Sequence, residues 1–461
     1  MDRDRYIDFL RAWAITLVVA GHWLITGLVR HPDGEITAPE LLATVPWTQW
    51  LTLGFQIMPL FFLAGGHAAS GSWERARADG ATAAGWVGGR AVRLLLPVAV
   101  YSGLVLLAVA VCSALGVDPV TLALVGWAMA MQFWFLPVYL LLSGLTPALY
   151  ALHRRWGPRV PVAMGAAALG VGTLVATADE RHTGAVGALG TLNYLLVWGV
   201  VYQLGFCWRD GRLGGERGDS GRLGGGRGVP VAMAVGGGAG FALLVGAGPF
   251  PVSLILVTGQ DLGNTDPPSV AMLAWAVAQV GVCLLVAPGV RRVLERARVW
   301  RAVRGLGAAS MTLYLWHMVP VLVVAAAFYL TDLAPEPAYG SAAWWALRVP
   351  WMVVLGGVLA GVLQALRPVE RGLRVWAARV RPDARLGGAA AARMWAGTAV
   401  SGWALTYFAG HGFADGGRFP LLAATGLALG VGSVLFPGRA GHRQAAESSR
   451  SGDEGAVGKA A

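Results

Sequence analysis

Apolar runs of about 20 residues recur along nearly the whole chain, separated by short segments rich in charge, Gly and Pro. About 20 apolar residues in a helix cross the hydrocarbon core of a bilayer. The pattern therefore predicts an all-α fold, a polytopic membrane helix bundle with a ten-helix core and two extra C-terminal helices. The twelve predicted helices are 7–29, 48–70, 91–115, 121–150, 160–177, 186–206, 229–247, 268–289, 308–330, 343–365, 393–411 and 419–437.

Composition agrees with this picture. Of the 461 residues, 56% are hydrophobic and only 13% are charged, and the mean hydropathy is +0.58. Soluble domains carry about a quarter charged residues. These values exclude a soluble enzyme and a disordered chain, and the repeated apolar runs exclude a protein with a single anchor. The three cysteines stand far apart inside apolar runs, so neither a disulfide framework nor a metal site is expected.

Arg and Lys predict the orientation of the chain, because cytoplasmic segments of membrane proteins carry an excess of them. With the N-terminus in the cytoplasm, 31 of the 36 Lys and Arg residues fall on cytoplasmic segments and four on outer ones. We therefore predict a multi-pass protein of the cell membrane with both termini cytoplasmic. The same distribution explains the pI of about 10.2 without a nucleic-acid partner.

The remaining segments suggest a domain division. Residues 1–365 form the predicted membrane core, 366–392 a charged cytoplasmic linker, 393–437 two additional transmembrane helices and 438–461 a disordered cytoplasmic tail. The Gly- and Arg-rich loop 209–228 is expected to be a flexible linker. No soluble part is large enough to carry separate chemistry, so any active site must lie among the helices.

The first helix carries three titratable groups, Asp8, Arg11 and His22. Such groups within membrane helices are costly and usually functional. The step from Arg11 to His22 is about 20° past three full turns, so the two share one face, roughly 16 Å apart. Asp8 lies three residues before Arg11, within reach of it. A snorkelling Asp8–Arg11 pair and a structural, buried His22 are alternatives that the spacing leaves open.

Other polar groups form a second set. Arg90 and Arg93 lie three residues apart at the cytoplasmic mouth of the third helix and suit a phosphate group, although ordinary positive-inside anchoring explains them equally. His67 in the second helix and His317 in the ninth are either site residues or structural histidines. No serine-protease, zinc-protease, P-loop or dinucleotide motif appears. What remains is a membrane-embedded histidine with cationic groups on the cytoplasmic side, which suits a general base acting on a hydroxyl with an anionic donor.

These residues carry a family resemblance. RYIDFLRAWAITLVVAGHW resembles the first helix of the membrane acyltransferase 3 family, in which a Gly-His step follows an Arg by eleven residues. MPLFFLAGGHAAS, RAVRLLLP, FWFLPVYLLL and SMTLYLWHMVPVL resemble later family elements in the same order. The resemblance covers about residues 5–365. One departure is Gly65-Gly66-His67, where many members have a Ser-Gly step.

The resemblance implies an acyltransferase that moves an acyl group, expected to be acetyl, from cytoplasmic acyl-CoA to a hydroxyl. The acceptor would be a carbohydrate of the cell envelope or a small secondary metabolite. His22 would be the catalytic residue, and Arg11, Arg90 and Arg93 would bind the donor. Asp8, His67, Tyr314 and His317 are candidates for supporting roles. Acyl-CoA would be a co-substrate, with no bound cofactor and no metal, and the lipid bilayer the other partner.

The alternative function is a twelve-helix secondary transporter, such as an exporter. It predicts internal repeats between the two halves of the chain. The first helix carries Asp8, Arg11 and His22, whereas the seventh, 229–247, carries no ionisable residue. This difference favours the acyltransferase.

Overall fold

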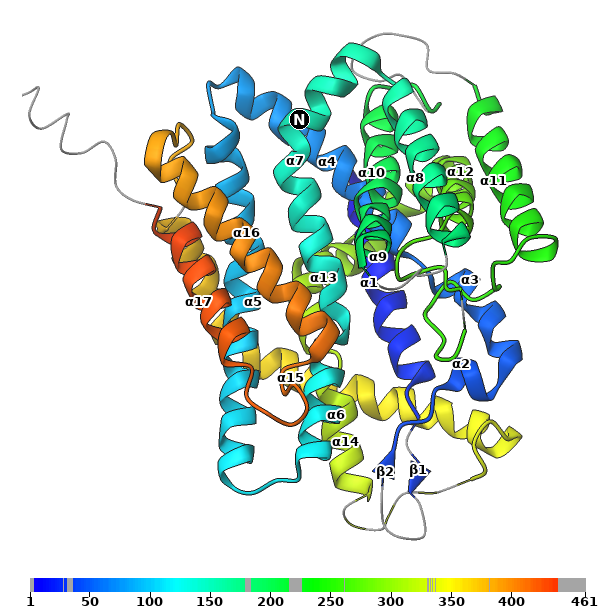
Figure 1. The fold of residues 1–461 in the computed structure, drawn as a ribbon, viewed down its shortest axis with the longest axis vertical. Coiled ribbons are helices and arrows are strands. Elements are labelled where there is room, and N and C mark those ends of the chain that lie inside the picture. Colours follow the sequence, from blue (N-terminus) through cyan, green and yellow to red (C-terminus); the bar gives the residue numbers. More distant parts are fainter. Residues whose placement is uncertain are drawn as a thin grey trace, which may run out of the picture. The chain divides into compact units, whose positions relative to one another are not determined.

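The computed structural model describes residues 4–437, apart from residues 28, 31–35, 179–183, 215–225, 261, 330, 332, 334, 336 and 381. The predicted tail after residue 437 and most of the predicted linker 209–228 therefore lie outside the described residues. The fold is an all-α helix bundle, as the apolar pattern predicts (Figure 1). It consists of two compact units: Met1–Glu74 with Leu141–Pro368 (unit 1), and Arg75–Leu140 with Val369–Ala461 (unit 2).

Each predicted membrane segment corresponds to one helix or to two consecutive helices. These are α1 (Arg5–Ile25), α4 (Met58–Ala78), α5 (Ala83–Ala114), α6 (Pro119–Ala130) with α7 (Phe135–Trp156), α8 (Arg159–Thr177), α9 (Gly184–Gly190) with α10 (Leu192–Arg209), α11 (Gly228–Gly246), α12 (Val270–Leu294), α13 (Ala297–Trp316) with α14 (Val319–Tyr329), α15 (Ala342–Arg379), α16 (Gly388–His411) and α17 (Leu421–Leu435). In the described part of the chain, nine spans are long and apolar enough to cross a membrane, and ten if the bent pair α13 and α14 counts as one. The protein is therefore a multi-pass membrane protein.

Short elements lie between α1 and α4. They are β1 (Val29–Arg30), β2 (Ile36–Thr37), α2 (Leu41–Thr44), the 3₁₀-helix η1 (Pro46–Leu51) and α3 (Thr52–Phe55). β1 and β2 form an antiparallel two-stranded hairpin. The predicted continuous helix 48–70 is thus wrong in its first turns, because α4 begins only at Met58. Pro59 explains this start, since proline lacks an N–H and is tolerated in the first turn of a helix.

The predicted linker 366–392 is mostly helical in the structure. Residues 366–379 continue α15, and 388–392 begin α16, which leaves a short connection between the two helices. Pro368 lies inside α15 without ending it. The charges in this stretch therefore lie mainly on helices.

Unit 1 contains α1 with the helices that surround it. α1 contacts α12 and α13, α8 packs on α10, and α11 packs on α12 (Figure 1). The α11–α12 contact is close because Gly237 faces the backbone of Ala278 and Gly281 faces the backbone of Ala234. Small residues allow such close approach of membrane helices, where van der Waals packing drives association.

Unit 2 contains α5 and α6 together with the two C-terminal helices. α16 and α17 pack on each other and both contact α5. Phe413, which is fully buried in the turn between them, packs against Tyr101 and Phe133 at ring-centroid distances of 6.1 and 5.4 Å. Its N–H also donates to the carbonyl of Gly126 at 3.1 Å. The two additional helices are therefore part of a packed unit with α5.

Candidate active site

The end of α1 positions His22. Asp4 caps the start of α1 by accepting from the N–H of Tyr6 at 2.9 Å. In the last turn, the N–H and the hydroxyl of Thr26 both donate to the carbonyl of His22, at 3.1 and 2.7 Å. The Arg348 guanidinium donates to the carbonyl of Thr26 at 2.7 Å. These bonds satisfy carbonyls that a helix end leaves unpaired, so they fix the backbone at His22.

A second histidine lies at a break in the helical pair α13 and α14. The two helices meet at an angle of 53°, with His317 and Met318 between them. The predicted continuous helix 308–330 is therefore wrong. Its physical reason is visible in the sequence: Pro320 cannot donate a hydrogen bond within a continuing helix, but fits the first turn of a new one. His317 itself is fully buried.

The structure brings His22 and His317 together. Nδ1 of His22 lies 2.7 Å from Nε2 of His317, and the ring centroids are 5.0 Å apart. Nδ1 of His317 lies 2.8 Å from the carbonyl oxygen of Tyr314, and the indole N–H of Trp23 donates to the carbonyl of His317 at 2.7 Å. Four residues that are nearly 300 positions apart in the chain thus form one hydrogen-bonded chain.

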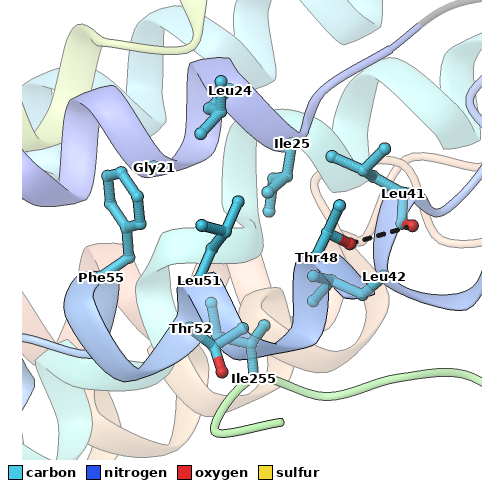
Figure 2. Close-up of a pocket in the computed structure, with 10 residues that line it drawn as sticks. All are labelled: Gly21, Leu24, Ile25, Leu41, Leu42, Thr48, Leu51, Thr52, Phe55 and Ile255. Atoms are coloured by element: carbon cyan, nitrogen blue, oxygen red, sulfur yellow. Dashed lines mark hydrogen bonds between the residues drawn. The ribbon is translucent and has the colours of Figure 1, made fainter. Parts of the chain in front are cut away.

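A small apolar cavity lies within one turn of His22 on α1. It measures about 20 Å³ and is lined by Gly21, Leu24, Ile25, Leu41, Leu42, Thr48, Leu51, Thr52, Phe55 and Ile255 (Figure 2). Figure 2 shows the hydroxyl of Thr48 turned toward the carbonyl of Leu41, to which it donates at 3.4 Å. No ionisable side chain lines the cavity, so it suits a small apolar group and not a charged one.

Arg11 and Asp8 lie toward the opposite end of α1. The guanidinium of Arg11 donates to the carbonyl of Ala64 on α4 at 3.5 Å, and Asp8 is buried at 6% exposure. His67 of α4 stacks on Trp208 with ring centroids 4.7 Å apart, and its charged surroundings include Arg11, Arg209 and Arg291. The structure thus separates His67 from the His22–His317 pair and places it in the cationic part of unit 1.

Arg90 and Arg93 belong to α5 in unit 2, one turn apart as predicted. The Arg90 guanidinium lies 4.8 Å from the ring centroid of Trp86 and donates to the hydroxyl of Tyr139 at 3.5 Å. Arg93 is exposed. Both are thus described within their own unit, on a helix that begins at a Thr82 cap.

Sequence reasoning missed two features of this site. Trp23 follows His22 directly, yet its indole, which is 5% exposed, provides the donor that holds the backbone of His317. The helix break was missed as well, although Pro320 signals it. In the part of the chain that the structure describes, no group of three or more His, Cys, Asp or Glu side chains could hold a metal ion.

A multi-pass helix bundle with a buried histidine pair at the end of its first helix is the frame on which the comparisons bear. Residues 4–366 match the family model Acyl_transf_3, described as an acyltransferase domain. The chain therefore belongs to this acyltransferase family and is an acyltransferase enzyme, which decides against the transporter. No curated protein and no solved structure matched the chain.

Proposed function

We propose that the enzyme moves an acyl group from cytoplasmic acyl-CoA to a hydroxyl of a glycan, cell-envelope or secondary-metabolite acceptor. The observation that carries this proposal is the pairing of His22 with the buried His317 within the acyltransferase domain. The orientation proposed is the one with both termini in the cytoplasm, at the cell membrane. Arg11, Arg90 and Arg93 are then at the cytoplasmic side, where an anionic donor arrives.

In the proposed reaction His22 is the general base. The acceptor oxygen attacks the thioester carbonyl while His22 takes the hydroxyl proton, and the carbon–sulfur bond then breaks. His22 returns the proton to the departing thiolate, so that the products are the acyl ester and free CoA. A group in this role must lie within hydrogen-bond reach of the hydroxyl, and it contributes roughly 10²–10⁴-fold in rate.

We propose acetyl as the transferred group. The apolar cavity of about 20 Å³ beside His22 has room for about one small group, and it lacks charge. A longer acyl chain would need Leu24, Leu51 or Phe55 to move. Comparing acetyl-CoA with longer acyl-CoA thioesters as donors tests this size limit, and an equal rate with long chains would contradict it.

The experiment that tests the function is acyl transfer by the purified protein. With acetyl-CoA it should release free CoA, and His22→Ala should lower that release by about 10²–10⁴-fold while the protein stays folded and inserted. His411→Ala is the matched control, because His411 is exposed on α16, and it should keep wild-type turnover. Release within a few-fold of wild type by His22→Ala would remove His22 from the mechanism. A mass shift on surface glycans or secreted metabolites in a deletion strain would identify the acceptor.

A further inference from the structure

We propose that His317 is a positioning residue that sets the tautomer of His22 and so makes Nε2 of His22 the proton-accepting atom. This inference rests on the proposed role of His22 as the general base. It goes beyond that role because it names the atom and the group that selects it.

The first step is the fixed position of His317. Its backbone N–H donates to the carbonyl of Leu313 at 3.1 Å, and its carbonyl accepts from the Trp23 indole at 2.7 Å. The residue is fully buried between α13 and α14. Its imidazole therefore has a defined place at the bend, next to the last turn of α1.

The second step is the tautomer of His317. Its Nδ1 lies 2.8 Å from the carbonyl oxygen of Tyr314, and a carbonyl oxygen can only accept a hydrogen bond. Nδ1 of His317 therefore carries the proton. A neutral imidazole has one N–H, so Nε2 of His317 carries a lone pair and acts as an acceptor.

The third step transfers this constraint to His22. Nε2 of His317 lies 2.7 Å from Nδ1 of His22, and the contact is a hydrogen bond only if Nδ1 of His22 donates. The proton of a neutral His22 then lies on Nδ1, and its Nε2 keeps the lone pair that a general base needs. The carbonyl of Tyr314 thus determines, through two rings, which nitrogen of His22 is basic.

The consequence appears when His22 has taken the hydroxyl proton. Nδ1–H then donates from a cationic ring to a neutral acceptor, and hydrogen bonds from charged donors are stronger than neutral ones. His317 therefore stabilises the charged form of His22 during the reaction and not only its orientation. Without an acceptor at this place, the other tautomer of His22, with its proton on Nε2, becomes available and cannot act as a base.

Two substitutions separate this role from mere packing. His317→Phe keeps a ring of similar size but no acceptor, and His317→Gln offers an amide oxygen that can accept from Nδ1 of His22. We expect His317→Phe to lower kcat by about 10–100-fold, as loss of an orienting partner does at other sites, with an unchanged KM for acetyl-CoA. His317→Gln should recover most of this loss. The double variant His22→Ala/His317→Phe should be no slower than His22→Ala alone, because the two residues act as one unit.

A measurement on the wild-type protein makes the test independent of folding of the variants. Nitrogen NMR of protein labelled at histidine reports which nitrogen of each ring is protonated, and the His22→Ala spectrum assigns the His22 signals. We expect a protonated Nδ1 and a bare Nε2 on both His22 and His317. A proton on Nε2 of His22, or full kcat in a folded His317→Phe, overturns the inference while leaving His22 as the base. Full turnover by His22→Ala would instead overturn the proposed function itself.

Discussion

Arg90 and Arg93 present two guanidinium groups on one face of α5, and Arg90 is held by Trp86 and Tyr139. We predict that Arg90→Ala and Arg93→Ala each raise the KM for acetyl-CoA by about tenfold or more, since a hydrogen bond to a charged group contributes about 1.5–3 kcal/mol. kcat should change less, because phosphate contacts are made equally in the ground and transition states. Steady-state kinetics of both variants check this.

Arg371→Ala is the matched control for these two substitutions. Arg371 is exposed on α15, so its loss should leave the KM unchanged. A fall in kcat alone in Arg90→Ala and Arg93→Ala would move both residues from donor binding to the chemical step.

Asp210, directly after α10, accepts a hydrogen bond from Nε2 of His153 at 2.8 Å. Burial alone would raise the pKa of Asp210, but this bond and the charges of His153, Arg212 and Arg154 lower the pKa below its ordinary value. Because the folded-state pKa is the lower one, the unfolded chain binds more protons in acid. The stabilisation from Asp210 is therefore complete above about pH 4 and is lost as the pH falls through the folded-state pKa.

We predict that thermal stability in detergent falls more steeply below about pH 4 for wild type than for Asp210→Asn. The asparagine keeps an acceptor for His153 but does not titrate. Other carboxylates contribute to both curves, so the difference between the two curves reports Asp210. Parallel curves would mean that the pair does not contribute to acid sensitivity.

Among the elements, α16 and α17 are joined by small residues. A Cβ at Gly397 would lie 2.6 Å from the carbonyl oxygen of Gly430 and 2.7 Å from Cβ of Ser433. We propose that these two helices support α5 and do not take part in transfer, because the partners of Arg90 lie outside them. A chain truncated near residue 391 should then insert and retain acyl transfer, with lower thermal stability because Tyr101 and Phe133 lose the packing of Phe413. Turnover of acetyl-CoA by monodisperse truncated protein measures this.

A pair of glycine variants tests the same element without removing it. Gly397→Leu should lower the melting temperature, because the leucine collides with α17, whereas Gly402→Leu should not, because nothing lies within 4 Å of a Cβ there. If the truncated protein is well folded but inactive, α16 and α17 belong to the active site and the proposed boundary at residue 366 moves.

For the whole molecule, the excess of Arg on alternate connections predicts that both termini lie in the cytoplasm, with an even number of membrane crossings. Reporter fusions at the N-terminus and the C-terminus should both give the cytoplasmic signal, and one inserted in the α11–α12 connection (residues 247–269) should give the outer one. α17 is the critical element, because its 15 residues span about 22 Å, less than the hydrocarbon core. Termini on opposite sides would show that one of the twelve segments does not cross.

The sequence by itself determined the fold class, the number of helical segments and the titratable residues of α1. Hydropathy is enough for this, because every backbone group in the hydrocarbon core must be bonded within its own helix. The match of residues 4–366 to the acyltransferase family agrees with the motifs of the first and ninth predicted helices. The helix limits at Met58 and at His317 were mistaken because apolar runs continue across the prolines that interrupt them.

Only the tertiary structure decided which histidine meets which. His22, His67 and His317 are equivalent in sequence terms, each a lone histidine in an apolar helix. His22 and His317 are in contact because α13 ends at Trp316 beside the last turn of α1, and the Trp23 indole holds the bend. That choice depends on contacts between residues almost 300 positions apart, and no local periodicity carries information about such contacts.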